Sequence, residues 1–280
     1  MREEPNCTGV FAGRASDGGR VRRSRVRLTD YLDFFAPLRL CVNLIGAALT
    51  YNHHMNTSEK NEPWAVLWDV DGTLVDTAEL HFQAWCALAR EIDKPFTRAD
   101  FAGTFGWRNP EIIPKLFGLH YTEQQVLELG DRKEDLYRDE AQKGVSLLPG
   151  VPGLLAAIGA AGGKQAIGSS APRRNIDLIL RNTQTAPHFA AVVAMEDTRR
   201  GKPDPEVFLL GAKALGVRPE RCIVLEDAPV GVQAAKSAGM RAIGVTFVAH
   251  HPAEKLRAAG ADLVVTSLDQ VNVDRLKALV

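Results

Sequence analysis

Two aspartates, Asp69 and Asp71, stand two residues apart at the end of the most apolar run of the chain, and Gly72 follows them. Such a run predicts a buried strand, so both carboxylates should lie where that strand meets its first turn. Two acids this close repel each other unless a cation offsets their charge, and oxygen ligands beside an open loop suit Mg²⁺. The alternative is a strand end with Asx turns, because Asp and Gly are common in turns.

A second acidic pair, Glu226 and Asp227, follows the apolar run 222–225 in "IVLEDAPVGVQAAKSAGM". In a parallel sheet these carboxylates would emerge at the same edge as Asp69. Lys202 stands in "GKPDPEVF", a loop that its two prolines stiffen. A lysine fixed at this edge could counter both the carboxylates and a phosphoryl group, and the alternative is a solvated surface charge.

Two serines, Ser169 and Ser170, end another apolar run in "KQAIGSSAP". Their hydroxyl and backbone N–H groups could hold phosphate oxygens at the start of a helix. An ordinary N-cap serine would give the same pattern, and the two interpretations are compatible. These segments together indicate a phosphate-binding edge that carries several acids and one lysine.

The elements that must position these residues are parallel strands connected by helices. Asp204 before Pro205 predicts the start of one helix, and Gly239 predicts the end of another that begins near Pro229. Apolar runs alternate with such segments from residue 64 onward, which is typical of an α/β sheet covered on both faces. The predicted strands are Trp64–Trp68, Gln165–Gly168, Ala191–Ala194, Cys222–Leu225, Ala242–Val245 and Asp262–Val265.

One interval, from Asp76 to about Ser146, contains helix signals and no strand. Three helix starts are predicted there, from the capping box Asp76-x-x-Glu79, from Asn109-Pro110 and from the capping box Thr122-x-x-Gln125. Because structureless loops of about 70 residues are rare, we interpret this interval as a small helical domain inserted after the first strand. The insertion lies at the carboxyl end of that strand, where open α/β sheets bind ligands.

Composition adds limits on partners and location. The chain has 280 residues, 45% of them hydrophobic, and its formal net charge is zero. No overall basic field therefore favours nucleic acid or a membrane as a partner. The four cysteines lie far apart without a C-x-x-C pair, which favours a reducing compartment, and we expect the protein to be cytoplasmic.

The N-terminal extension, residues 1–62, does not match the rest of the sequence. It carries an arginine cluster at 14–27 without helical or strand periodicity, and the apolar stretch after it is too short for a membrane span. A signal peptide fits poorly because the segment before the apolar stretch is too long. We expect this extension to be disordered or to lie upstream of the true start, with Met55 as the alternative first residue.

In their order along the chain, the four segments around Asp69, Ser169, Lys202 and Glu226 resemble the haloacid dehalogenase superfamily of phosphoryl-transfer enzymes. The resemblance extends from Trp64 to the C-terminus. It implies a Rossmann-like α/β fold, a parallel sheet core flanked by helices, with an inserted all-helical cap domain. We place the core at 63–76 and 146–280, and the cap at 77–145.

The resemblance also implies a role for each motif residue. Asp69 would be the nucleophile that takes the phosphoryl group, and Asp71 would protonate the leaving oxygen and then activate water. Ser169 and Lys202 would bind the transferring phosphoryl oxygens.

The same resemblance implies a Mg²⁺ site at the acidic edge. Its ligands would be Asp69, the backbone carbonyl of Asp71, and Asp227, while Glu226 would act mainly through metal-bound water. Mg²⁺ is thus the expected cofactor.

The cap segments "DTAELHFQAW" and "FGWRNPEII" are similar to those of the branch that contains β-phosphoglucomutase and sugar-phosphate phosphatases. By this resemblance His81 would link cap closure to the acid/base, with a packing histidine as the alternative. Arg108 and Lys133 would grip the distal part of the substrate, and Ser170 would join them as a substrate contact. Lys133 lies in a charged helix, so a solvated face is its alternative.

We expect hydrolysis of small phosphomonoesters, sugar phosphates in particular, through an aspartyl-phosphate. β-Phosphoglucomutase activity, which interconverts β-glucose 1-phosphate and glucose 6-phosphate, is the main alternative. A non-catalytic phosphometabolite-binding protein on the same fold is a further alternative. Dehalogenation is disfavoured because Asp71 is the acid that phosphoryl transfer needs. The expected partner is a small phosphorylated metabolite, and the expected state is a monomer or weak homodimer.

Overall fold

The structure is a computed structural model that describes residues 62–118 and 120–280. The predictions made for residues 1–61, including the alternative start at Met55, lie outside the described residues. Among the described helices none is both long and apolar enough to cross a bilayer.

A six-stranded parallel sheet forms the centre of the fold, in the order β3-β2-β1-β4-β5-β6. The predicted strands are confirmed to within one residue at each end, and with them the α/β fold class. The central strand β1 pairs with β2 on one side and with β4 on the other. The strands are β1 (Ala65–Trp68), β2 (Lys164–Gly168), β3 (Ala191–Val193), β4 (Cys222–Glu226), β5 (Arg241–Val245) and β6 (Leu263–Val265).

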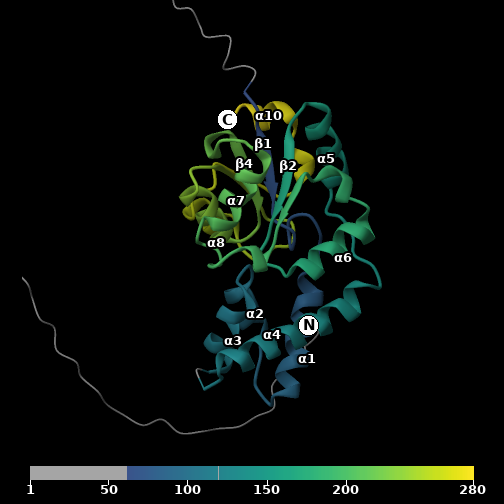
Figure 1. Cartoon of the computed structure of the whole chain (residues 1–280), viewed down its shortest axis with the longest axis vertical. Helices are drawn as coiled ribbons and strands as arrows, with labels where there is room; N and C mark the ends of the chain where they lie inside the picture. Colours follow the sequence, from purple (N-terminus) through teal and green to yellow (C-terminus); the bar gives the residue numbers. More distant parts are fainter. Residues whose placement is uncertain (1–61, 119) are drawn as a thin grey trace, which may run out of the picture. The chain divides into compact units, whose positions relative to one another are not determined.

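Both faces of the sheet are covered by helices, which explains why the strands read as continuous apolar runs (Figure 1). Val66 and Trp68 of β1 pack in one hydrophobic cluster, while Ala65 and Leu67 pack in the cluster of the opposite face. The first cluster includes residues of α5 (Val151–Ala160), α6 (Arg173–Thr183) and α10 (Val273–Lys277). The second includes residues of α7 (Glu206–Leu215), α8 (Pro229–Ser237) and α9 (Ala253–Ala258). Short 3₁₀ helices are η2 (Ala186–His188), η3 (Met195–Asp197), η4 (Pro219–Arg221) and η5 (Leu268–Gln270).

Four helices lie between β1 and α5, and we call them the helical block. They are α1 (Ala78–Glu91), α2 (Arg98–Thr104), α3 (Asn109–Phe117) and α4 (Glu123–Ala141). An aromatic-rich cluster, which includes Phe82, Trp85, Phe96 and Phe101, buries the inner faces of these helices. The described residues of 77–145 contain no strand.

Two details of the helix starts differ from prediction. The prediction of a capping box at Asp76-x-x-Glu79 is wrong, because α1 begins after Thr77 without a side-chain cap. The Glu79 carboxylate instead pairs with Arg98, at 2.6 Å, so it does not reach back to a cap N–H. The short helix α2 was not predicted, although Thr97 and Asp100 form a capping box there.

The prediction of the Thr122–Gln125 capping box is confirmed. Asn109-Pro110 does open α3. Helix α7 begins at Glu206, one residue after the predicted first position, and the Asp204 carboxylate accepts a hydrogen bond from the Glu206 N–H at 3.1 Å.

Truncation of the central strand should be costly, because Leu67 is fully buried between β1 and α7. We expect Leu67→Ala to lower the free energy of unfolding in urea by about 2–5 kcal/mol. Leu209→Ala, on the exposed side of α7, is the matched control and should change it by less than about 1 kcal/mol. Equal losses in the two variants would contradict the assignment of β1 to the centre of the core.

Candidate active site

The carboxyl ends of β1 and β4 bring three buried acids together. Asp69 follows β1 directly, Glu226 ends β4, and Asp227 follows it. One oxygen from each of these carboxylates lies within 4.8 Å of the others. The sheet order explains the cluster, because β1 and β4 are neighbours and the Asp69 N–H donates to the carbonyl of Leu225.

Lys202 enters this cluster from the loop before α7. Its Nζ lies 2.6 Å from Asp69 Oδ1 and 3.1 Å from Glu226 Oε1, and the residue is only 4% exposed. Burial lowers the pKa of Lys202, but the two carboxylates outweigh burial and hold the pKa above its ordinary value. The lysine is therefore a fixed cation at the acidic edge, as the sequence predicted for its position.

The cluster sets three buried acids against one lysine. Burial raises the pKa of Asp69, raises that of Glu226 to about 8, and raises that of Asp227 well above its usual range. Asp227 Oδ2 is buried and accepts no hydrogen bond from the described residues. Three carboxylates with one orphaned oxygen are a donor set that fits a hard divalent cation.

Two glycines make room for these carboxylates. Gly72 has a φ of 89° in the turn after Asp71, and a Cβ at this position would collide with the Asp227 carboxylate. A Cβ at Gly231, in α8, would collide with the Glu226 carboxylate. Sequence reasoning missed Gly231, although it was visible within "APVGVQ".

Asp71, two residues after Asp69, has different partners. Its Oδ1 accepts a hydrogen bond from Thr77 Oγ1 and lies 3.1 Å from His81 Nε2. Burial raises the pKa of Asp71, but His81 and Thr77 outweigh it, so the pKa is below its ordinary value. The two aspartates thus differ in environment, because Asp69 faces the lysine and the acids while Asp71 faces the helical block.

A chain of polar contacts continues from Asp71 into the helical block. Lys133 Nζ lies 2.7 Å from His81 Nδ1 and donates to Glu134 Oε1 at 2.9 Å. An ammonium group can only donate, so Nδ1 must accept and the imidazole proton sits on Nε2, which faces Asp71. Lys133 is 2% exposed, so the solvated face considered for it is wrong.

Glu134 connects these polar contacts to the core. Its carboxylate accepts hydrogen bonds from Asn109 Nδ2 at 2.7 Å and from Asn175 Nδ2, on α6, at 2.6 Å. Burial raises the pKa of Glu134, but Lys133, His81 and Asn109 outweigh it and keep the pKa below its ordinary value. Sequence reasoning missed Glu134 and Asn175, because their pairing depends on the packing of α4 against α6.

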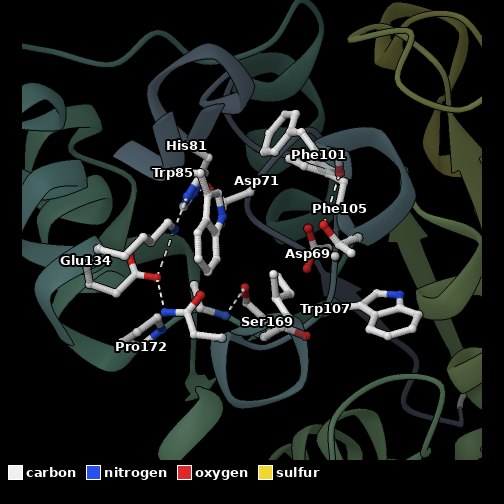
Figure 2. A pocket seen from close by; sticks show the side chains of 17 residues that line it. Asp69, Asp71, His81, Trp85, Phe101, Phe105, Trp107, Glu134, Ser169 and Pro172 are labelled. Atoms are coloured by element: carbon white, nitrogen blue, oxygen red, sulfur yellow. Dashed lines mark hydrogen bonds and ion pairs between the residues drawn. The ribbon is translucent and has the colours of Figure 1, made fainter. Parts of the chain in front are cut away.

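A pocket lies between the carboxyl edge of the sheet and the helical block. Figure 2 shows Asp69 and Ser169 near the same space as Trp85, Phe105 and Trp107. Among the predicted site residues the lining includes Asp69, Asp71, His81, Lys133, Ser169 and Ser170. Ser169 Oγ also accepts from the Ala171 N–H at 3.1 Å, so it is a turn serine as well as a lining residue.

Arg108 lines a neighbouring cavity rather than this pocket, and its role as a substrate ligand stays a prediction. Its guanidinium donates to the carbonyls of Thr198 and Arg199, at 3.2 and 3.3 Å. In this structure the arginine is bound to the core loop that precedes Lys202. The sequence around Arg108 does not reveal these partners, because they lie about 90 residues away along the chain.

The family model for haloacid dehalogenase-like hydrolases matches residues 65–239, and the chain belongs to that family. β-Phosphoglucomutase of Bacillus subtilis is 36% identical to it over 76% of this chain and 93% of that protein. The phosphorylated carbohydrates phosphatase of Thermotoga maritima is 32% identical over 75% of this chain and 97% of that protein. The solved β-phosphoglucomutase of Clostridium difficile has a TM-score of 0.70 at 26% identity, over 78% of this chain and 96% of that chain. The predicted resemblance, fold class and enzyme class are confirmed.

The crowding of buried acids predicts an unusual effect of Asp227→Asn. In EDTA at neutral pH this variant should raise Tm by at least about 2 °C. Folded wild-type protein must keep the Asp227 carboxyl protonated, or bury its charge, at a pH where the unfolded chain ionises it, and the amide avoids both costs. Asp131→Asn, on the exposed face of α4, should leave Tm unchanged. Differential scanning calorimetry checks both variants. A lower Tm for Asp227→Asn in EDTA would show that the cluster is balanced without a cation.

Proposed function

We propose that this protein hydrolyses small phosphomonoesters, sugar phosphates in particular, through an aspartyl-phosphate formed on Asp69. The observation that carries the proposal is that two neighbouring aspartates have different partners. Asp69 is held by Lys202 at 2.6 Å in a charged cluster, while Asp71, two residues on, faces His81 at 3.1 Å. Both line the same pocket, so one can attack and the other can move a proton.

The cofactor in this proposal is Mg²⁺. Asp69, Asp227 and the backbone carbonyl of Asp71 would bind it, with Glu226 acting mainly through metal-bound water. The orphaned Asp227 oxygen and the all-carboxylate donor set support this assignment. When bound, Mg²⁺ supplies positive charge that offsets the phosphoryl oxygens and the attacking carboxylate.

The chain's own groups then perform the transfer. The Asp69 carboxylate attacks phosphorus while the bond from phosphorus to the leaving oxygen breaks. The protonated form of Asp71, which its low pKa makes the minor form before substrate binds, gives its proton to that oxygen. Asp71, now a carboxylate, takes a proton from the water that attacks the aspartyl-phosphate and releases phosphate. Lys202 and Ser169 hold the phosphoryl oxygens, whose charge grows less localised in a loose transition state. His81 and Lys133 orient the Asp71 carboxyl, with Ser170 at the pocket wall.

The relatives support a sugar phosphate as substrate. They include the hexitol phosphatase A and the fructose-1-phosphate phosphatase YqaB of Escherichia coli, at 31% and 29% identity. The β-phosphoglucomutase of B. subtilis, at 36%, keeps phosphoglucomutase activity as a second candidate. The two activities share the first transfer and differ in whether water or a sugar hydroxyl accepts the phosphoryl group.

We also propose a setting for this activity. The protein would act in the cytoplasm, as a monomer or weak homodimer, on a small metabolite rather than on nucleic acid or a membrane. The zero formal net charge supports this choice of partner.

Asp69→Asn tests the catalytic assignment. Wild-type protein with Mg²⁺ should release phosphate from members of a sugar-phosphate panel that contains both glucose 1-phosphate anomers. Asp69→Asn should lower kcat by 10³-fold or more, an order-of-magnitude estimate, because the amide cannot attack. Asp131→Asn is the matched control and should keep full activity.

The same panel separates the two candidates. Conversion of β-glucose 1-phosphate to glucose 6-phosphate, primed with glucose 1,6-bisphosphate, would favour the mutase over the phosphatase. A wild-type protein that neither releases phosphate nor converts β-glucose 1-phosphate would contradict both.

A further inference from the structure

One side chain of the core, Asn175, continues the polar contacts of the helical block into the core. It lies in the first turn of α6 and is 1% exposed. Its Nδ2 donates to Glu134 Oε2 at 2.6 Å, and its Oδ1 accepts from Arg138 Nη1 at 2.8 Å. Among the hydrogen bonds that described residues make with Lys133 and Glu134, only the one from Asn175 comes from the core.

The amide of Asn175 fits its two partners in only one orientation. The ionised Glu134 carboxylate can only accept a hydrogen bond, while the Arg138 guanidinium can only donate. These two residues lie one helical turn apart on α4, so they share one face of that helix. One planar amide therefore meets a carboxylate and a guanidinium side by side, which an apolar or an acidic side chain of the same size could not do.

The polar contacts run between two fixed points of the core. Asp71 Oδ1, after β1, lies 3.1 Å from His81 Nε2, and Lys133 Nζ lies 2.7 Å from His81 Nδ1. Glu134 accepts from Lys133 through Oε1 and from Asn175 through Oε2. Because α6 follows β2, the neighbour of β1, the sheet fixes how far apart the two ends lie. The orientation of the His81 ring toward Asp71 thus depends on a residue of α6.

We propose that Asn175 is a positioning residue for proton transfer by Asp71. It fixes Glu134 against Lys133, and Lys133 in turn holds the imidazole of His81. Asn175 does not line the pocket, so it acts on the reaction only through these side chains. Its loss should therefore impair the step that uses the proton of Asp71 and spare the attack on phosphorus. This inference rests on the proposed phosphoryl-transfer function and adds a residue outside the pocket to it.

Two substrates test this, because they differ in their need for a proton. The leaving oxygen of a sugar phosphate needs the proton of Asp71, whereas acetyl phosphate releases acetate, a stable anion, when its bond to phosphorus breaks. Asn175→Asp keeps the bond from Arg138 but sets a second carboxylate against Glu134. With Mg²⁺ it should lower kcat/KM for the sugar phosphate that wild type hydrolyses fastest by about 10- to 100-fold. The kcat/KM for acetyl phosphate should stay nearly unchanged.

Asn182→Ala is the matched control. Asn182 also lies on α6 and also bonds to α4, since its Nδ2 donates to the carbonyl of Ala141 at 3.2 Å. This variant should leave kcat/KM unchanged for both substrates. Equal losses on the two substrates in Asn175→Asp would mean that Asn175 only holds two helices together, and would overturn the proposal. A selective loss in Asn182→Ala would overturn it as well.

A double variant restores the contact with exchanged groups. In Glu134→Gln/Asn175→Asp the amide introduced at 134 can donate to the carboxylate introduced at 175. Its oxygen can still accept from Lys133 and Asn109, as Glu134 Oε1 does. The double variant should recover at least about threefold of the sugar-phosphate kcat/KM that Asn175→Asp loses. A double variant that is no better than Asn175→Asp would show that the loss does not pass through Glu134, and would overturn the proposal.

The His81 ring gives a readout that does not depend on activity. Lys133 can only donate to Nδ1, so wild-type His81 should carry its proton on Nε2, which long-range ¹H–¹⁵N spectra report. His81→Gln assigns the signals. In Asn175→Ala the Nδ1 signal should shift, and in Asn182→Ala it should match wild type.

Unchanged His81 signals in Asn175→Ala would overturn the proposal. If wild-type protein released no phosphate from either substrate, the proposed function would fail. The spectra would still decide whether Asn175 positions His81.

Discussion

The rest of the structure depends on the burial of one ammonium among three carboxylates. Lys202 Nζ reaches Asp69 and Glu226 inside a site where burial alone would disfavour every one of these charges. The neighbouring strands β1 and β4 deliver the acids, and the close fit of glycines at 72 and 231 leaves room for them. One lysine faces three acids here, which is why we propose Mg²⁺ at this site.

The helical block completes the site by supplying the partners of Asp71. Asp71 is held through His81 to Lys133, and Glu134 continues the contacts to Asn175 in the core. Asp69 and Asp71, two residues apart, therefore have distinct environments, although one strand end carries both. Tyr137 of α4, which lies in a separate small cluster with Ala84 and Ala141, supports these polar contacts: it is fully buried and stacks on His81 with ring centroids 4.0 Å apart.

The strands were predicted to within a residue because both faces of the sheet are covered, so burial alone determines their pattern. The strand order then explains the meeting of Asp69 with Asp227, which needed only the parallel topology. Contacts that depend on packing between distant helices or loops could not be predicted in this way. Glu79 is taken by Arg98 rather than by a cap, and Glu134 pairs with a residue 41 positions away. Arg108 was assigned to the substrate because its chemistry suits a phosphate, whereas its partners depend on where the loop at 198–201 lies.

The proposed mechanism depends most on covalent phosphorylation of Asp69. Brief incubation of wild-type protein with ³²P-labelled substrate and Mg²⁺, followed by acid quench and peptide mapping, measures this directly. We expect one labelled peptide that contains Asp69, with label that hydroxylamine releases, as for an acyl phosphate. Label on a different residue would contradict the mechanism. Phosphate release without labelled protein, in samples quenched within the first turnover, would contradict it as well.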